Sequence, residues 1–521
     1  MSESTPITGA RSALLALADA GVGICFANPG TTELDMVRAL DGLDAIRCVL
    51  GLQENVCTGA ADGWGRMTGH CAATLLHLGP GFANGIANLH NARRARTPIV
   101  NLIGDHTSWH LPFDAPLSSD IESLAHPVSG WVRRVGSAAA MATDARAAVA
   151  ATRQAGGQIA TLILPADFQA AELAHAGTAG VDAQDSAAPA PFDLAGAVAA
   201  CRASRHPVLL LGGGGERSAL GAAGQRAAAR LCAHLGARAF AETFPSRAER
   251  GQGLPAFDRL PYFPEAARAV LDPADRVFLV GAAPPVTYFG YPGQPSQMVE
   301  PARLHVLAAP GDDAAARLEA LADALGAPPW QAGAPLPLPD APSGPLTPPK
   351  VAAALARALP SGAIVSVEGG TCGYPFYTVS ATAAAHTTLT NTGGAIGQGL
   401  PVALGAALAC PSRRVVALVS DGSTQYTVQT LWSMAHEQAD ITVLVAANHQ
   451  YGILRQELRR AGALNAQSEA LTALDRPRID WVRLAEGYGV PACRADSAER
   501  LAEALAASFA RPGPFLVEMS L

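Results

Sequence analysis

The chain has 521 residues, of which 49% are hydrophobic and 16% charged, and its formal net charge is −7. This composition favours large buried cores and excludes an intrinsically disordered chain. Because the net charge is negative and no basic block interrupts the sequence, nucleic acid is not expected as a partner. No apolar run is long enough to span a bilayer, so no membrane association is expected.

The N-terminal residues have an early glutamate and an amphipathic pattern, without the basic start and apolar centre of a signal peptide. Nine cysteines are scattered with no CxxC spacing, which is typical of reduced, cytoplasmic proteins. Lys350 is the only lysine and lies in a proline-rich segment. A pyridoxal Schiff base and a phosphate-binding GK[ST] loop need a lysine in other settings, so both are excluded.

Short β-rich runs alternate with Ala- and Leu-rich helical stretches along the whole chain. Continuous apolar strands between helices predict an α/β fold of three domains, each a doubly wound parallel sheet. Two linkers, around 183–193 and 326–350, separate the domains. The predicted domains are residues 1–182, 193–330 and 348–521.

The first domain begins with CFANPGTTEL, which predicts a strand that ends in a tight turn at 28–30. CVLGLQENVCTGAADGWG predicts a strand followed by a helix of small residues, with Glu54 where the helix dipole stabilises a carboxylate. The run LLH ends the next strand at His77. A histidine can move protons near neutral pH, whereas a lone histidine at a strand end is usually structural, and both readings remain open.

The middle domain begins with HPVLLLGGGGERSALGAA, which predicts the strand, glycine loop and helix of a Rossmann-like unit. The following strand ends near Glu242, the position of a ribose-binding acid in dinucleotide-binding proteins. A lone glycine cluster is weak evidence for a nucleotide. FAD is therefore an alternative cofactor here, but it is not favoured.

The third domain has polar residues at the ends of two successive apolar strands, VVALV and ITVLVAA. Asp421 follows the first strand and Asn448 the second, at the spacing of one strand–helix–strand unit. Their oxygens are ligands that Mg²⁺ prefers when it is shared with phosphate. Gly422 lets the backbone approach a phosphate, and Ser423 can donate to it. The opposing interpretation, a helix cap at Asp421 and a turn at Asn448, is weakened by this spacing.

These motifs together resemble the thiamine-diphosphate-dependent 2-oxo acid decarboxylase and acetolactate synthase large-subunit family, and benzoylformate decarboxylase-like members in particular. The resemblance runs from about residue 7 to 521. The family's cofactor motif, GDG followed by about 25 residues and NN, reads here from SDGSTQ to AANHQYG. Ser420 and Ala447 depart from it by replacing the usual glycine and the first asparagine.

The resemblance assigns roles to individual residues. Asp421 and Asn448 would bind Mg²⁺ through their side chains and Gln450 through its carbonyl, and Glu54 would activate the cofactor at its aminopyrimidine ring. The other expected cofactor contacts are Asn28, Pro29, Gly30, Gly370, Thr371, Gly394, Ile396, Gly422, Ser423 and Tyr451. His77 is the expected catalytic histidine, and the expected substrate pocket contains Thr31, His106, His110, Leu117 and Phe289.

One departure concerns proton donors. Phe289 stands where benzoylformate decarboxylase has a second catalytic histidine, in the loop 286–295 of the middle domain. His106 and His110 compensate for that loss in one interpretation and are surface loop histidines in the other.

The expected function is thiamine diphosphate- and Mg²⁺-dependent decarboxylation of a 2-oxo acid, or carboligation to an acyloin or acetohydroxy acid, or both. The alternatives are a 2-hydroxyacyl thioester lyase, a flavin-linked 2-oxo acid oxidase and a catalytically silent homologue. In the family the two halves of each site come from different chains. A cytoplasmic homodimer or homotetramer with sites at subunit interfaces is therefore expected.

Overall fold

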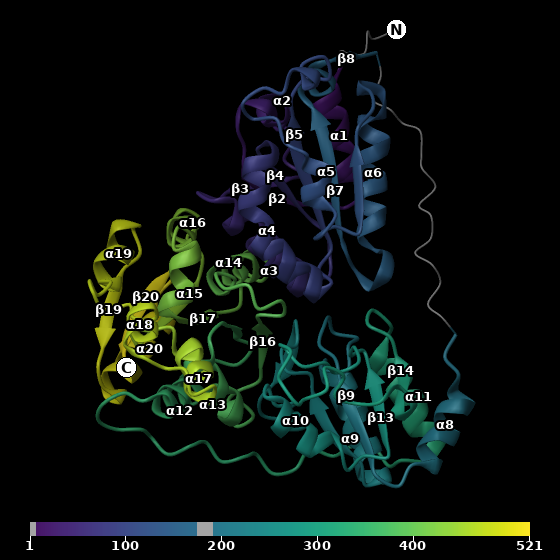
Figure 1. The fold of residues 1–521 in the computed structure, drawn as a ribbon, viewed down its shortest axis with the longest axis vertical. Coiled ribbons are helices and arrows are strands. Elements are labelled where there is room, and N and C mark those ends of the chain that lie inside the picture. The colour runs from purple at the N-terminus through teal and green to yellow at the C-terminus, as the bar shows by residue number, and fades with distance from the viewer. Residues whose placement is uncertain (1–6, 175–190) are drawn as a thin grey trace.

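The computed structural model describes residues 7–174 and 191–521. Three mainly parallel sheets lie in three parts of the chain, each with helices on both faces (Figure 1). The predicted α/β class and its three doubly wound sheets are confirmed. The predicted boundary at residue 182 and residues 183–190 of the first linker lie outside the described ranges. None of the helices within these ranges is long and apolar enough to cross a membrane.

The first sheet is buried on both faces, so its central strands are apolar throughout. The sheet consists, in spatial order, of β3 (Arg47–Leu50), β2 (Ile24–Asn28), β4 (Ala72–Leu76), β5 (Ile99–Asp105), β7 (Ile159–Pro165) and β6 (Trp131–Arg134). One face packs against α3 (Glu54–Thr68), α4 (Leu78–Ala95) and α5 (Ile121–Ala125). The other packs against α1 (Gly9–Asp19), α2 (Leu34–Ala39) and α6 (Met141–Thr152). The short helix α7 (Ala166–Ala170) and the antiparallel pair β1 (Ile7–Thr8) and β8 (Glu172–Leu173) complete this part.

The second sheet has five parallel strands. They are β12 (Asp258–Arg259), β10 (Arg238–Ala241), β9 (Pro207–Leu211), β13 (Arg276–Val280) and β14 (Leu304–Ala308). Helices α8 (Leu194–Ala203), α9 (Ala222–Leu235) and α11 (Ala314–Leu325) cover one face. Helix α10 (Pro264–Leu271) lies on the other.

The third sheet has seven strands, and one of them comes from the range predicted as the middle domain. They are β11 (Ala248–Arg250), β16 (His386–Thr390), β15 (Ile364–Val367), β17 (Val415–Ser420), β18 (Ile441–Ala447), β20 (Phe515–Ser520) and β19 (Ala492–Ala495). Only β11 pairs antiparallel. Helices α12 (Pro348–Ala358), α13 (Gly370–Ser380) and α20 (Ala498–Phe509) cover one face. The other carries α14 (Gly399–Ala409), α16 (Thr430–His436) and α19 (Trp481–Gly487). The short helices α15 (Asp421–Thr424), α17 (Gly452–Arg460) and α18 (Ala466–Leu471) follow β17 and β18.

The first and third parts share one continuous hydrophobic core, because α3 lies directly against α14 (Figure 1). Small residues allow this close approach. A Cβ atom on Gly63 would lie 2.2 Å from the Val402 carbonyl oxygen, and one on Gly405 would lie 1.9 Å from that of Ala60. Backbone therefore meets backbone at the helix crossing, and the run of small residues around ADGWG has a packing role.

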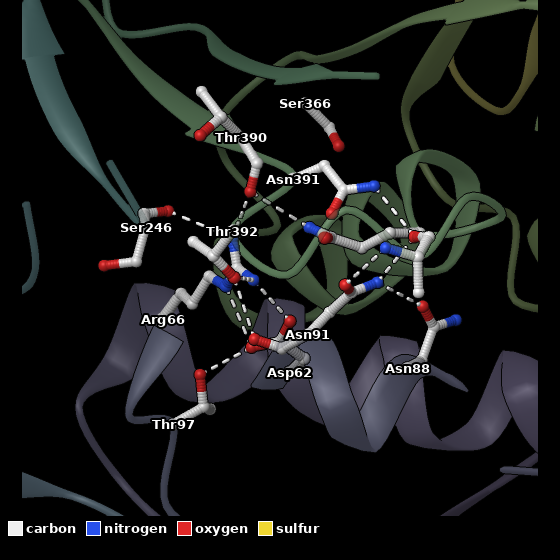
Figure 2. A network of polar contacts seen from close by, with 12 residues as sticks. Asp62, Arg66, Asn88, Asn91, Thr97, Ser246, Ser366, Thr390, Asn391 and Thr392 are labelled. Carbon is white, nitrogen blue, oxygen red and sulfur yellow. Dashed lines mark hydrogen bonds and ion pairs between the residues drawn. The ribbon is translucent and has the colours of Figure 1, made fainter. Parts of the chain in front are cut away.

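A buried ion pair lies where the three parts meet (Figure 2). On α3, Asp62 accepts two hydrogen bonds from the Arg66 guanidinium, at 2.8 and 2.6 Å. Of the other guanidinium N–H groups, those on Nη1 reach the Ser246 carbonyl at 3.2 Å and the Thr390 carbonyl at 2.7 Å, and one on Nη2 reaches Thr392 Oγ1 at 3.3 Å. The Arg66 side chain is 2% exposed and that of Asp62 is fully buried. Arg66 thus links the first part to the segment before β11 and to the end of β16.

We expect Arg66→Met to lower the thermal midpoint strongly, because it leaves the Asp62 carboxylate buried without its partner. Breaking such a pair costs about 3–5 kcal/mol. The double variant Asp62→Leu/Arg66→Met should regain much of this loss, since it removes both charges. Differential scanning fluorimetry measures both midpoints, and a single variant as stable as the wild type would contradict the expectation.

His386, at the start of β16, is a buried histidine of the third part. Its Nδ1 lies 2.8 Å from the Ala384 carbonyl oxygen, and its Nε2 is buried without a partner. Burial lowers the pKa of the imidazole to about 4 from its ordinary value of 6.5. The folded protein therefore resists protonation of this ring.

The sign of the pH effect follows from these values. Between about pH 6.5 and 4 the unfolded chain binds the proton and the folded chain does not, so stability is lost as the pH falls through this window. From neutral pH to about pH 5 the His386 contribution amounts to about 2 kcal/mol. We expect His386→Gln to flatten the fall of the thermal midpoint over this range, and an unchanged slope would argue against the assignment.

Candidate functional site

The carboxyl ends of β17 and β18 bring Asp421 and Asn448 to adjacent loops. The strands pair in parallel, with Ser420 opposite Ala446. Asp421 is 1% exposed, and its two oxygens accept from the His449 N–H at 2.6 Å and the Gly422 N–H at 2.8 Å. Burial raises the pKa of Asp421, and the two N–H groups oppose this effect. The loops that carry Asp421 and Asn448 therefore lie side by side, as the spacing of the two residues predicts.

A third loop joins these two at the end of β15. Asn448 Nδ2 donates to Thr371 Oγ1 at 3.2 Å, and Asn448 Oδ1 accepts from the Gln450 N–H at 3.1 Å. Gly370 and Thr371 begin α13. The structure therefore brings Thr371 to the same edge of the sheet as Asp421 and Asn448.

Ser420, the residue that replaces the usual glycine, packs against Gly369. A Cβ atom on Gly369 would lie 2.1 Å from Ser420 Oγ, and Gly369 has a φ of 99°. The Ser420 carbonyl accepts from the hydroxyls of Ser423 and Thr424, at 3.0 and 2.7 Å. The serine hydroxymethyl group therefore occupies the space that a side chain at position 369 would need.

The donor set at this edge fits a magnesium diphosphate. The Asp421 carboxylate, the Asn448 amide oxygen and the Gln450 carbonyl are hard oxygen ligands of the kind Mg²⁺ prefers. Gly422 has no side chain where the Tyr451 ring approaches, since a Cβ atom would lie 2.6 Å from Tyr451 Cε1. Within the described ranges no group of three or more His, Cys, Asp or Glu side chains is placed to hold a metal, so a cation here would depend on one carboxylate and neutral oxygens.

The loop 391–398 carries Gly394 and Ile396. A buried glutamate that the sequence did not indicate fixes the shape of this loop. Glu368 is 3% exposed and accepts from the backbone N–H groups of Gly397, Gln398 and Gly399, at 2.8, 3.0 and 3.0 Å. Burial raises the pKa of Glu368, although these hydrogen bonds oppose the rise. The carboxylate also lies at the N-terminus of α14, where the helix dipole favours an anion.

Helix α4 of the first part holds the other side of this loop (Figure 2). Asn91 donates to the Ala395 carbonyl at 2.8 Å and accepts from the Ala395 N–H at 3.1 Å. Asn88 donates to the Gly397 carbonyl at 3.2 Å. Ile396 is half-buried between these anchored residues, and Gly394 is exposed. Neither asparagine stood out in the sequence, because their partners lie some three hundred residues away.

Glu54 is the first residue of α3, as predicted. Asn84 Nδ2 donates to Glu54 Oε2 at 3.1 Å. A Cβ atom on Gly81 would lie 3.2 Å from Glu54 Oε1, so the start of α4 lies against the carboxylate. Among the described residues, no hydrogen bond or ion pair joins Glu54 to Asp421, Asn448 or Thr371.

The turn 28–31 lies beside His77. Asn28 Nδ2 donates to the Gly51 carbonyl at 2.7 Å, which ties the turn to the loop before Glu54. A Cβ atom on Gly30 would lie 2.3 Å from His77 Nδ1, so only glycine fits against the ring. His77 Nδ1 lies 2.9 Å from Glu33 Oε2. Thr31, next to Pro29 and Gly30, is exposed.

The loop 106–121 also reaches this region. The His106 and His110 rings meet edge to face at 5.3 Å, and His106 Nε2 is buried without a partner. Leu117 is 40% exposed. Ser119 packs against the first turn of α4, because a Cβ atom on Gly79 would lie 2.3 Å from Ser119 Oγ. Ser119, two residues after the predicted pocket residue Leu117, thus lies at the helix start that follows His77.

The loop 286–295 lies against the loop 391–398 through Tyr288, the residue before Phe289. Phe289 is 59% exposed. Tyr288 instead lies against Gly394, whose Cβ position would be 3.6 Å from Tyr288 Cε1. The Tyr288 ring also contacts Phe244 at 5.3 Å and Tyr262 at 5.0 Å. Tyr288, Phe244 and Tyr262 thus form an aromatic wall beside the exposed Gly394. Side chains of an irregular loop do not alternate regularly, so the sequence contained no signal for this wall.

The glycine loop of the second part is closed by Glu242. Glu242 Oε1 accepts from the Gly213 N–H at 2.6 Å. Burial raises the pKa of this carboxyl to about 7. The candidate ribose-binding acid thus hydrogen-bonds the glycine loop of its own part of the chain.

Comparisons with known proteins match both ends of the chain. The model of the thiamine pyrophosphate enzyme N-terminal TPP binding domain matches residues 7–124, and that of the C-terminal TPP binding domain matches residues 370–519. A Mycobacterium tuberculosis protein named "Putative acetolactate synthase large subunit IlvX" is 49% identical over 98% of this chain and 99% of its own. Benzoylformate decarboxylase of Pseudomonas aeruginosa is 30% identical over 96% of each chain.

A solved structure shares the fold. The thiamine diphosphate-dependent 4-hydroxybenzoylformate decarboxylase of Rhodococcus jostii superposes with a TM-score of 0.83 at 24% identity, and 99% of each chain is covered. At this identity the likeness concerns the fold.

We expect Glu368→Gln to weaken thiamine diphosphate binding about tenfold, because the amide nitrogen would face at least one backbone N–H group that now finds an acceptor. Isothermal titration calorimetry measures the dissociation constant. Glu499→Gln is the matched control, since Glu499 accepts from the Gly344 N–H on the exposed surface. Equal affinities in wild type and Glu368→Gln would contradict the role of this carboxylate.

Proposed function

Because the chain belongs to the thiamine pyrophosphate enzyme family, we propose that it binds thiamine diphosphate with Mg²⁺ and decarboxylates a 2-oxo acid, transfers the resulting acyl unit to a second carbonyl compound, or does both. The observation that carries the proposal is the meeting of Asp421, Asn448 and Thr371 at one sheet edge. When bound, the cofactor supplies an electron sink for the substrate's carbonyl carbon.

The residues at the sheet edge hold the diphosphate in this proposal. Asp421, Asn448 and the Gln450 carbonyl bind Mg²⁺, and Gly422, Ser423, Gly370 and Thr371 border the phosphates. The buried setting of Asp421 supports this role, because a carboxylate in low dielectric gains more from a cation than an exposed one does.

Two residues of the first part move protons in this proposal. Glu54 holds a proton at the aminopyrimidine ring, and Asn84 orients its carboxylate. His77 moves a proton at the substrate. The aromatic wall at Tyr288, with Phe244 and Tyr262, favours a 2-oxo acid with an apolar side chain.

A complete site needs a second copy of the chain in this proposal. Glu54 has no polar contact with the metal-site residues of its own chain, as far as the structure describes it. Large apolar side chains are exposed on the first and third parts: Trp109 is 68%, Phe113 73% and Leu471 85% exposed. Burying them supports a homodimer or homotetramer with sites at subunit interfaces. The nine free cysteines suit a reducing, cytoplasmic location.

We expect wild-type protein to bind thiamine diphosphate in a Mg²⁺-dependent manner and Asp421→Asn to bind it at least about tenfold more weakly. Glu54→Gln should retain binding and lose about a hundredfold or more in kcat. Calorimetry measures binding. A panel of 2-oxo acids, scored separately for carbon dioxide, aldehyde and acyloin, measures turnover.

Asp496→Asn is the matched control for Asp421, because Asp496 pairs with Arg500 on the exposed surface. Lack of cofactor binding by the wild type would refute the proposal and point to a silent homologue. Binding without turnover of any 2-oxo acid would favour a thioester lyase, and FAD in the purified protein would favour an oxidase. Full activity in Glu54→Gln would refute the role given to that residue.

A further inference from the structure

Glu33 is a fully buried carboxylate between the turn 28–31 and β5. Its side chain has no exposed surface, and a Cβ atom on Gly104 would lie 1.8 Å from Glu33 Oε1. Oε2 accepts from the Gly30 N–H at 2.8 Å and lies 2.9 Å from His77 Nδ1. Oε1 accepts from the Thr32 hydroxyl at 2.7 Å. Two glycines thus leave room for one glutamate and one imidazole.

The donors around Glu33 decide where the imidazole carries its proton. An ionised carboxylate only accepts hydrogen bonds, so the contact at 2.9 Å needs a hydrogen on His77 Nδ1. Thr32 Oγ1 also lies 3.1 Å from Nδ1 but gives its only hydrogen to Glu33. The neutral ring therefore has Nδ1 protonated and an unshared electron pair on Nε2.

The other ring nitrogen is open. Nε2 of His77 has no hydrogen-bond partner among the described residues, and this atom is not fully buried. The side chain as a whole is 22% exposed. The ring thus has one nitrogen fixed inside the protein and the other accessible.

We propose that Glu33 is a positioning residue for His77: it fixes the ring orientation and the Nδ1–H tautomer, so that Nε2 accepts a proton from the substrate side and returns it from there. The inference rests on the proposed function for the role of His77. The tautomer itself is a property of the folded protein and does not depend on that function.

The first experiment reads the tautomer directly. Wild-type protein labelled with ¹⁵N-histidine is measured by NMR at a pH where the ring is neutral, and His77→Asn identifies the signal. The expected result is a protonated Nδ1 and an unprotonated Nε2. A neutral ring protonated at Nε2 would overturn the inference, whether or not any substrate is turned over.

The second experiment is a double-mutant cycle on kcat. In Glu33→Gln the amide nitrogen would face Thr32 Oγ1, and the released hydroxyl hydrogen can turn to His77 Nδ1 and disfavour the Nδ1–H tautomer. We expect kcat to fall at least about tenfold, with cofactor affinity and thermal midpoint near those of the wild type. In the His77→Asn background the same substitution should have no further effect on kcat.

Each outcome of the cycle decides the inference. Additive losses would show that Glu33 does not act through His77 and would overturn it. If Glu33→Gln does not fold, the NMR measurement on the wild type decides alone. Absence of 2-oxo acid turnover in the wild type would refute the proposed function and leave the tautomer result standing.

Discussion

The Asp62–Arg66 pair is the contact on which the arrangement of the three sheets depends. A guanidinium has five N–H donors in a rigid plane, and here that plane faces a carboxylate of its own helix and carbonyls of two other parts of the chain. Burial removes water as an alternative partner, so each lost hydrogen bond leaves a polar group unsatisfied. The pair therefore stabilises the observed placement of α3 against the segment before β11 and the end of β16.

Buried carboxylates that accept several hydrogen bonds also stabilise the candidate site. Glu33, Glu368 and Asp421 are buried, and each accepts at least one hydrogen bond from a backbone N–H group of a turn or loop. A loop lacks the regular ladder of a helix or sheet, so its N–H groups need acceptors from elsewhere. An anion supplies several acceptor positions at one point and is stabilised in return. The loops of the candidate site are thereby held by carboxylates of the chain itself.

The sequence predicted the local parts of this structure well. The three sheets followed from apolar runs between helices, and the meeting of Asp421 with Asn448 followed from the spacing of one strand–helix–strand unit. Residues whose partners are distant in sequence were missed. Asn88, Asn91 and Glu368 look like ordinary polar residues until the fold brings them to the loop 391–398. Tyr288, which lies against Gly394, was also missed, because an irregular loop has no fixed alternation of side chains. The linker 183–193 was read from composition alone, and residues 183–190 stay outside the described chain.

The close crossing of α3 and α14 limits how parts of this protein can be exchanged with those of its relatives. Gly63 and Gly405 leave no space for even a methyl group against the opposing backbone. A chimera that takes its N-terminal part from one relative and its C-terminal part from another would join helix surfaces shaped for different partners. A single larger residue at either glycine would push the helices apart and move Asn88 and Asn91 away from the loop 391–398. Recombination between relatives should therefore succeed only where both helices come from the same parent.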